Sequence, residues 1–168
     1  MKKVGIFYAS DTGNTEAVAE KMLAAFGEDN AQLFDVSDAD ADDMADFDNL
    51  IFSSPTWGVG DLQDDFEEFL EELEEADLDG KKVAFFGLGD AVTYEDTFVD
   101  AMGTIYEAIQ DKGCEFVGAV STDGYEFEES LAVKDDKFVG LPLDEDNEDD
   151  KTDERIEKWV AQLQGEFA

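Results

Sequence analysis

The sequence predicts a three-layer α/β fold, in which a doubly wound, five-stranded parallel sheet carries helices on both faces. Two observations lead to this prediction. Apolar runs of strand length alternate along the chain with segments of helical periodicity, an order that implies right-handed crossovers between parallel strands. The chain has 168 residues, of which 43% are hydrophobic, enough for one domain with its own core. We therefore expect residues 1–168 to form a single domain.

The first half of the chain contains three of the five strands. The continuous apolar run from Val4 to Ala9 is typical of a strand buried on both faces, and the helical pattern from Thr15 to Phe26 stops at Gly27. A short second strand is expected from Gln32 to Val36. After a polar, Asp-rich segment, the third strand runs from Leu50 to Ser54. The next helix is indicated by apolar residues at helical spacing, namely Leu62, Phe66, Phe69, Leu70 and Leu73.

The second half begins with the fourth strand, from Lys82 to Leu88, and a helix from Thr97 to Gln110. Phe116 to Val120 and Phe138 to Leu143 are expected to be strand segments. The polar stretch between them, Ser121 to Lys137, is longer than a usual connection, so we interpret it as an excursion that splits or extends the last strand. Thr152 is expected to cap a final helix whose inward face is formed by Ile156, Trp159 or Val160, and Leu163.

The charge of the chain is strongly negative. Lys and Arg together number 11 and Asp and Glu 46, a formal net charge of −35. Such a charge repels a nucleic-acid backbone and an anionic membrane surface. It favours partner proteins with basic docking patches, which it attracts over a distance. A solvated surface suited to high salt explains the same composition, and the two interpretations are compatible.

The counts of two residue types restrict the chemistry further. No His is present, which excludes His-based triads, general bases and metal sites, and a single cysteine excludes an intramolecular disulfide. We expect that cysteine, Cys114, to be a buried structural thiol, because it precedes an apolar run. No signal-peptide pattern follows Met1, and no apolar run approaches the length of a membrane span, so we expect a cytoplasmic protein.

A loop at the end of the first strand is suited to an anion. It reads Ser10-Asp11-Thr12-Gly13-Asn14-Thr15 and precedes a helix, whose N-terminal N–H groups attract negative charge. Hydroxyl and amide donors are present, and Gly13 allows the backbone to come close. The loop has no Lys or Arg and matches neither GxxxxGKS/T nor GxGxxG, so it favours one monophosphate held by dipoles. An ordinary Ser/Thr-rich helix cap explains this loop equally well when the loop is taken alone.

Two further loops fall at the same edge of the predicted sheet, because the carboxyl ends of parallel strands lie together. The third strand runs into "SPTWGVGD" (residues 54–61), and the fourth into "GLGD" (residues 87–90), with Tyr94 beyond it. Trp57 and Tyr94 lie outside the apolar periodicity of the core. Each residue alone is more simply a cap on the core, but together with a phosphate cradle they predict a slot for a flat conjugated ring.

Several stretches in these loops and beyond them resemble the flavodoxins, small proteins that transfer electrons on bound FMN. They are "SDTGNTE", "PTWGVGDLQDD", "FFGLGD" with "TYEDTF", "STDGYEFEES" and "FVGLPLDEDNEDDKTDERIEKWV". They follow in order over nearly the whole chain, and the excursion is similar to the insertion of the long-chain subgroup. The resemblance implies a flavodoxin-like fold, non-covalently bound FMN, and a monomeric, low-potential one-electron carrier with no catalytic residues, metal or substrate turnover of its own.

The resemblance also implies which residues contact each part of FMN. The ring would stack between Trp57 and Tyr94, and Asp146 would lie near the ribityl chain. Thr97 and Val99 stand where many flavodoxins carry Asn and Gln, so their contacts are expected to be mainly through the backbone. The other expected contacts are Ser10, Asp11, Thr12, Gly13, Asn14 and Thr15 at the phosphate, Pro55, Thr56, Gly58, Val59 and Gly60 near the N5 edge, and Leu88, Gly89, Asp90 and Phe98 with Thr97 and Val99 near the pyrimidine edge.

A cradle without cations has a consequence for the reduction potential. A positive charge near the flavin would favour its anionic, fully reduced form, whereas a neutral cradle in a negative protein does the reverse. Unit charges at contact range near a surface interact by about 1–4 kcal/mol, and about 59 mV corresponds to a tenfold change, so several acids can shift the potential by roughly 100 mV. We expect this field to come from Asp61, Asp64, Asp65, Asp90 and Glu95.

Gly58 is expected to act as a second control on the flavin. Its peptide can turn a carbonyl toward a protonated N5 in the one-electron-reduced cofactor, and the φ that this needs is accessible to Gly at little cost. We therefore predict that the neutral one-electron-reduced form is stable over a wide range of potential.

The implied partners are basic-patched redox proteins, such as a reductase of the ferredoxin–NADP reductase type and low-potential oxidoreductase complexes. An FMN-dependent NAD(P)H:quinone reductase shares the fold and is the alternative function. A phosphoacceptor receiver domain is disfavoured, because the third strand ends in Ser53-Ser54-Pro55 rather than in Asp. The run Asp144 to Asp150 lacks the Gly and Glu of a calcium-binding EF-hand loop, so we expect a solvated acidic face that can serve in docking.

Overall fold

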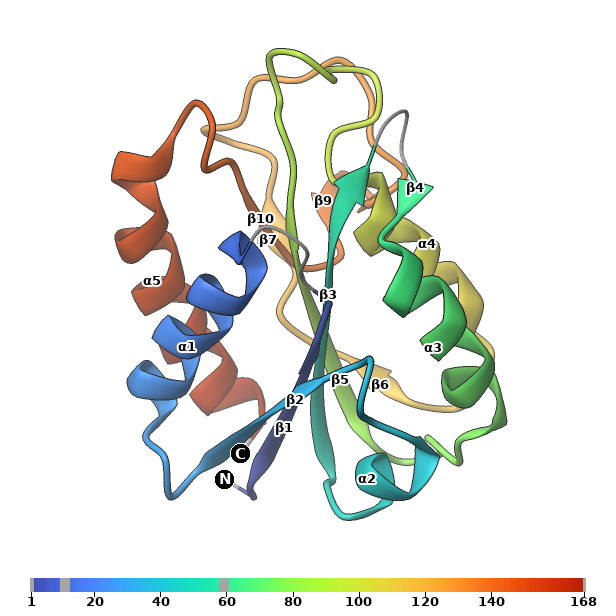
Figure 1. The fold of residues 1–168 in the computed structure, drawn as a ribbon. Coiled ribbons are helices and arrows are strands. Elements are labelled where there is room, and N and C mark those ends of the chain that lie inside the picture. Colours follow the sequence, from blue (N-terminus) through green and yellow to red (C-terminus); the bar gives the residue numbers. More distant parts are fainter. Residues whose placement is uncertain (1, 10–12, 58–60, 168) are drawn as a thin grey trace.

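The main sheet contains five parallel strands in the order expected for a doubly wound fold. The computed structural model describes residues 2–9, 13–57 and 61–167, with the backbone alone at positions 57 and 61. The strand order is β10-β5-β3-β1-β2, and every pairing along it is parallel. The predicted sheet is therefore confirmed (Figure 1). Its strands are β1 (Val4–Tyr8), β2 (Ala31–Asp35), β3 (Asn49–Trp57), β5 (Lys82–Leu88) and β10 (Leu141–Leu143).

Helices cover both faces of this sheet and complete the three layers. Figure 1 shows α1 (Asn14–Phe26) and α5 (Thr152–Glu166) side by side on one face. On the other face lie α3 (Asp64–Glu75) and α4 (Asp100–Ile109), with the short helix α2 (Ala41–Ala45) beside α3. The main sheet has a separate apolar core on each face.

The two cores arise from the alternation of side chains along each strand. In β1, Ile6 packs under α1 and α5, whereas its neighbour Phe7 packs under α3 and α4. Phe85 and Phe86 of β5 divide in the same way, and Trp159 of α5 contacts Phe86 at a ring-centroid distance of 6.3 Å. The continuous apolar runs of the sequence are therefore explained by burial on both faces.

The last strand is split, which is one of the two arrangements that the sequence analysis left open. β6 (Glu115–Phe116) pairs with the beginning of β5, and β10 pairs with its end. Between them the chain leaves the main sheet over residues 121–137, which we call the excursion. Its ends form a small antiparallel sheet of order β7-β9-β8. The strands of this sheet are β7 (Val120–Ser121), β8 (Val133–Lys134) and β9 (Lys137–Phe138).

Several local features differ from the sequence predictions. β3 continues past Ser54 to Trp57, because β4 (Asp61–Leu62) folds back and pairs with its end. The helix α2 was not predicted, and Asp40 begins it by accepting hydrogen bonds from the N–H groups of Asp42 and Asp43. The predicted cap at Thr152 is wrong.

Thr152 is instead the first residue of α5, which continues directly from the 3₁₀ turn η1 (Asp149–Lys151). Its side chain is buried, and its hydroxyl has no hydrogen-bond partner in the structure. The inward face of the helix was predicted correctly, since Ile156, Trp159, Val160 and Leu163 are all buried.

Cys114 lies between the end of α4 and β6, and it is half-buried rather than fully buried. Its Sγ atom lies 3.9 Å from the carbonyl oxygen of Ile109, and the side chain packs on the core under α3 and α4. Burial raises the pKa of the thiol, so the group stays protonated and structural at neutral pH. Within the described ranges, no helix has the length and apolar character needed to cross a membrane.

Candidate functional site

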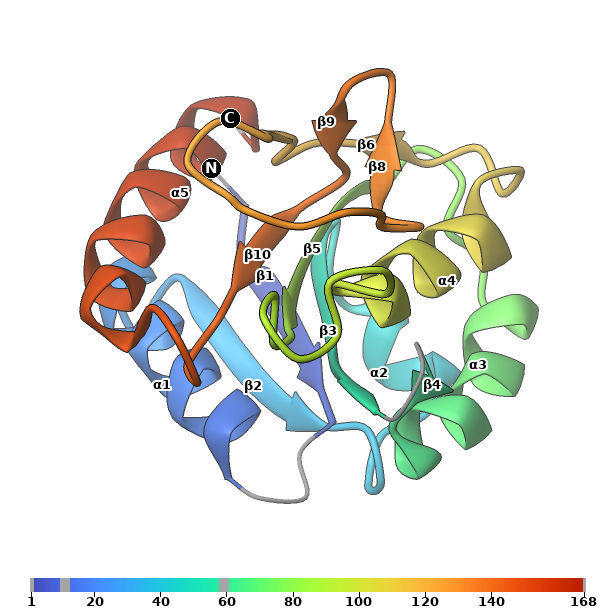
Figure 2. The same ribbon diagram turned by 90° about the horizontal axis from the view of Figure 1, so that it is seen from above.

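The predicted loops converge at one edge of the sheet. β1, β3 and β5 are neighbours and end on the same side of the sheet, as the view from above shows (Figure 2). The chain reverses its direction of winding between β1 and β3, which is the position where ligands bind in open α/β sheets. The ends of the strands therefore define the candidate site.

The first loop places the beginning of α1 at this edge. Gly13 is the N-cap of α1 and has a left-handed backbone with φ of 88°, and a Cβ at this position would meet no atom within 4 Å. Asn14 is exposed and Thr15 is buried in the first turn. The helix thus offers N–H donors and open space beside Gly13, which suits an anionic group. Ser10, Asp11 and Thr12 lie outside the described residues.

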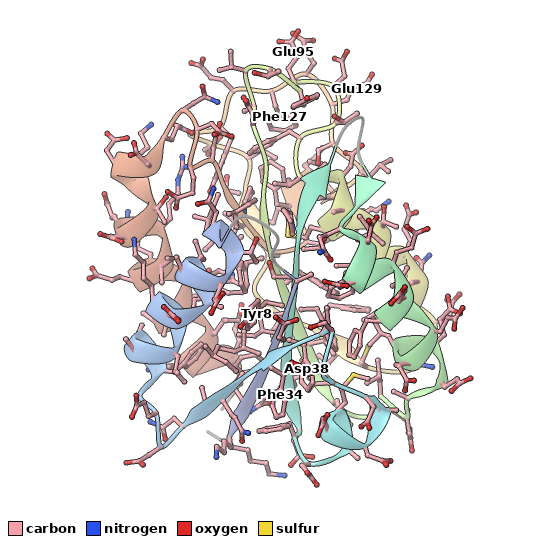
Figure 3. The ribbon with its side chains drawn as sticks, in the orientation of Figure 1. Tyr8, Phe34, Asp38, Glu95, Phe127 and Glu129 are labelled. Carbon is pink, nitrogen blue, oxygen red and sulfur yellow. The ribbon has the colours of Figure 1, made fainter. Side chains whose placement is uncertain are left out.

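The side chains around the first loop carry negative rather than positive charge. Glu16 is in the first turn of α1, and the first basic residue of the helix is Lys21, five residues after it. Tyr8, at the end of β1, has a pKa raised first by burial and then by nearby carboxylates such as Glu16 and Asp38 (Figure 3). An anion held here would be bound by dipoles, as the sequence predicts.

The second loop leaves the end of β3. Pro55 pairs with Leu88 of β5, so the second and third loops start from adjacent positions. Thr56 is half-buried, and its hydroxyl accepts a hydrogen bond of 3.2 Å from the N–H of Ala101 in α4. Trp57 is the last residue of the strand, and its backbone pairs with Asp61 of β4. Gly58, Val59 and Gly60, and the direction of the Trp57 ring, lie outside the described residues.

The third loop connects β5 to α4 over residues 89–99. Asp90 accepts hydrogen bonds from the N–H groups of Val92 and Thr93, which close the first turn of the loop. Tyr94 is 43% exposed, and its N–H donates to the carbonyl of Asp90 over 3.0 Å. Thr97 is half-buried. An exposed tyrosine on this loop agrees with the predicted aromatic wall.

Two residues of the third loop face inward instead of toward the site. Phe98 is buried, and its ring lies among the rings of Tyr125, Phe127 and Phe138 at centroid distances of 5.7–6.2 Å. Val99 is fully buried. Any contact of these two residues with a ligand is therefore made by the backbone, as expected for Val99.

The loop after β10 is hydrogen-bonded to the third loop. Asp146 is exposed, and its pKa is raised first by burial and then by Asp90 and Asp144. Asp144 is buried with 1% exposure, which contradicts the prediction that the whole run Asp144–Asp150 is a solvated face. Its carboxylate is satisfied because it accepts hydrogen bonds from the N–H of Ala91 and from Asn147.

Asn147 is a residue that the sequence analysis missed. Its side-chain amide donates to Asp90 over 2.8 Å and to both oxygens of Asp144, so it joins the third loop to the loop after β10. Burial alone would raise the pKa of Asp90, but hydrogen bonds from Thr93, Asn147 and Val92 outweigh it and lower the pKa below its ordinary value. The only sequence signal was a single amide within a run of acids.

The site is therefore electronegative where it is described. Of the five acids expected to set the field, Asp64 and Glu95 are exposed and Asp65 and Asp90 are half-buried. The side chain of Asp61 lies outside the described residues. Low exposure of Asp65 and Asp90 reduces solvent screening, so their charges act more strongly on a ligand at the edge of the sheet.

Fold and strand order together define a class: doubly wound α/β proteins in which the loops after neighbouring parallel strands leave one edge of the sheet at its switch point. The chain belongs to the flavodoxin family, whose profile matches residues 6–159. It is 51% identical to a flavodoxin of Nostoc sp. over 166 residues, which cover 99% of this chain and 98% of the relative. It is 49% identical over 168 residues to a flavodoxin of Helicobacter pylori, with full coverage of both chains.

The fold agrees with this assignment. The crystal structure of a Fusobacterium nucleatum flavodoxin bound to flavin mononucleotide matches with a TM-score of 0.95 and 34% identity over 100% of both chains. Flavodoxins are electron-transfer proteins without substrate turnover of their own. The family and the fold class were therefore predicted correctly from the sequence.

Proposed function

We propose that this protein is a low-potential one-electron carrier that binds FMN non-covalently in a single domain. The observation that carries the proposal is that β1, β3 and β5 are neighbours whose carboxyl ends share one edge of the sheet, in a chain that belongs to the flavodoxin family. FMN supplies one-electron chemistry when it is bound. The protein contributes binding, orientation and a negative potential.

The described residues fit FMN. Gly13 and Asn14 at the start of α1 offer dipoles and open space to a phosphate, with no cation nearby on the helix. Gly89 lies so close to Val99 that a Cβ would approach the Val99 nitrogen within 3.0 Å, so the backbone at the proposed pyrimidine edge is compact. Tyr94 supplies an exposed ring for stacking. We propose the remaining contacts at Ser10–Thr12, Trp57–Gly60 and Asp146 as the resemblance implies them.

The negative charge supports the proposed low potential. Asp65 and Asp90 are half-buried near the ends of β3 and β5, where their charges oppose a further negative charge on the ligand. The proposed turn of the Gly58 carbonyl toward N5 adds to this control. Both effects favour release of the second electron at low potential.

We propose that the partners are redox proteins with basic docking patches, of the ferredoxin–NADP reductase type or belonging to low-potential oxidoreductase complexes. A net charge of −35 would steer such partners toward this protein. Val92 is 70% exposed and Tyr94 43% exposed on the loop beside the site, so an apolar contact is available within an acidic surface. We further propose a monomeric, cytoplasmic protein.

A visible spectrum of the purified protein tests the proposal. We expect flavin absorption bands, FMN fluorescence quenched by stacking, and apoprotein that regains these properties with FMN in a 1:1 ratio. We also expect no reduction by NADPH alone and rapid reduction when a ferredoxin–NADP reductase is added. A colourless protein that cannot take up FMN would contradict the proposal, and rapid reduction by NADPH alone would favour a reductase enzyme.

A further inference from the structure

Val99 has a backbone conformation that is rare for its residue type. Its φ of 49° and ψ of 30° lie in the left-handed region, and it is the N-cap of α4 without a side-chain cap. A β-branched residue in this region is strained and persists only when its surroundings impose the conformation. Val99 is also fully buried, at the end of the loop proposed to meet the pyrimidine edge of FMN.

The excursion binds the residues on both sides of Val99. The Ser130 hydroxyl donates a hydrogen bond to the carbonyl of Phe98, and the N–H of Leu131 donates to the carboxylate of Asp100 over 2.7 Å. Ser130 is itself held, because its hydroxyl accepts from the N–H of Ala132 over 3.1 Å. We call these two contacts, at Phe98 and Asp100, the clamp.

The clamp belongs to a wider contact between the excursion and the third loop. The N–H groups of Glu128 and Glu129 both donate to the carbonyl of Glu95, over 2.8 and 3.0 Å. Figure 3 shows Glu95 and Glu129 together at the top of the molecule, with Phe127 beneath them. At Gly103, one turn into α4, a Cβ would collide with the carbonyl group of Leu131, so the two backbones touch.

The carboxylate of Asp100 is buried where it accepts the hydrogen bond from Leu131. The residue is 6% exposed, and its pKa is raised by burial more than the hydrogen bond from Leu131 lowers it, with Glu129 adding to the rise. A buried carboxylate is costly unless it has hydrogen-bond partners. The buried carboxylate of Asp100 therefore needs the N–H of Leu131 as its partner, and the same hydrogen bond holds the excursion against α4.

We propose that the excursion acts as a conformational clamp for the cofactor: Ser130 and Asp100 are positioning residues that hold Val99 in its left-handed conformation and so fix the backbone that meets the pyrimidine edge. This inference rests on the proposed function, because it assumes FMN at the site. It assigns the excursion a role within the protein itself, separate from any contact with partners.

The experiment measures FMN affinity in clamp variants with and without the strain at position 99. We expect Ser130→Ala and Asp100→Ala each to raise the Kd for FMN at least fivefold. Asp100→Asn should stay within twofold of wild type, because the amide oxygen still accepts from Leu131. In a Val99→Gly background the same clamp variants should change Kd less than twofold, since Gly adopts the left-handed region without help. Ser121→Ala, elsewhere in the excursion, is the matched control and should have no effect.

Two further readouts separate positioning from general stability. If the clamp orients the pyrimidine edge, its loss should change the ratio of the affinities for oxidised and reduced FMN at least threefold, about 28 mV in a one-electron midpoint potential. Amide exchange at Asp100 and Leu131 in the apoprotein should become at least tenfold faster in Ser130→Ala, whether or not FMN binds. The amide-exchange measurement therefore tests the clamp even if the protein does not bind FMN.

The proposal would be overturned if Ser130→Ala and Asp100→Ala raised the Kd for FMN equally in the wild-type and Val99→Gly backgrounds. The two contacts would then act independently of the strained backbone at position 99. Unchanged Kd and unchanged midpoint potential in both clamp variants would overturn it as well. If wild-type protein did not bind FMN, the proposed function and the role of the clamp toward FMN would both be contradicted. Faster amide exchange in Ser130→Ala would still show that the clamp holds the backbone around Val99.

Discussion

Gly103 has no side chain, and this allows α4 and the excursion to approach each other closely. It lies inside α4, where Gly lowers helix stability by roughly 0.5–1 kcal/mol relative to Ala. A Cβ there would overlap the Leu131 carbonyl, whereas a Cβ at Gly165 in α5 would meet no atom within 4 Å. The same substitution should therefore have opposite effects at the two positions.

We predict that Gly103→Ala destabilises the protein by about 1–3 kcal/mol, because the steric overlap exceeds the gain in helix propensity. Gly165→Ala should be neutral or stabilising by up to about 1 kcal/mol. Urea unfolding followed by circular dichroism measures both values. A Gly103→Ala variant as stable as wild type would show that the excursion can move away from α4 at little cost.

For single residues, the sequence indicated the type of side chain in the loops better than the direction in which each side chain points. Residue type and position after a strand correctly indicated that Gly13 precedes the first helix and that Tyr94 is exposed on a loop. The inward orientation of Phe98, the burial of Asp144 and the role of Asn147 depend on segments far away in the chain, which no local pattern contains. All the expected contacts with FMN stay predictions.

Tyr125 links the excursion to β10 and α5. Its hydroxyl donates to the carbonyl of Pro142 in β10 over 2.8 Å, and the guanidinium of Arg155 in α5 lies 4.2 Å from its ring centroid. Arg155 also contacts the carboxylate of Glu148 at 3.2 Å. Burial raises the pKa of Tyr125 from 10.0 to about 12, with Arg155 opposing and Glu148 adding to the shift. The folded state therefore favours the protonated phenol.

The sign of this shift gives an alkaline stability prediction. Because the folded pKa exceeds the unfolded value, the contribution is complete below pH 10 and is lost as the pH rises toward 12. A shift of two units corresponds to about 2–3 kcal/mol. In urea unfolding between pH 9 and 12, wild type should lose about this much more stability than Tyr125→Phe, which cannot ionise there. Parallel pH profiles for the two proteins would contradict the assignment.

At the element scale, periodicity identified the long strands and helices and failed for short ones. The strands of the main sheet were found because continuous apolar runs identify burial on both faces. The five-residue helix α2 has too few residues for a periodic pattern, and the signal for it was the Asp40 capping residue alone. The cap expected at Thr152 failed because the turn η1 starts the helix earlier, so Thr152 already lies inside it.

At the scale of the whole molecule, the negative charge gathers on helices away from the site as well as beside it. α3 reads DDFEEFLEELEE, with acids in eight of its twelve positions and no basic residue. Glu71 and Glu75 are both exposed and four residues apart, a spacing at which like charges repel, and Glu75 also opposes the dipole at the helix C-terminus. The fold is held by its two apolar cores against this repulsion.

This repulsion predicts that salt stabilises the protein. The Debye length falls from about 30 Å at 0.01 M to about 10 Å at 0.1 M, so most of the gain in melting temperature should occur below roughly 0.3 M NaCl.

The triple variant Glu68→Gln, Glu71→Gln, Glu75→Gln removes three exposed charges from α3. It should melt higher than wild type at 0.01 M NaCl and approach wild type as salt is added, because screening replaces the removed charges. Melting curves of the apoprotein measure both effects, so that cofactor binding does not contribute. If salt lowered the melting temperature, or if the triple variant melted below wild type at low salt, self-repulsion would not be what limits the stability of this chain.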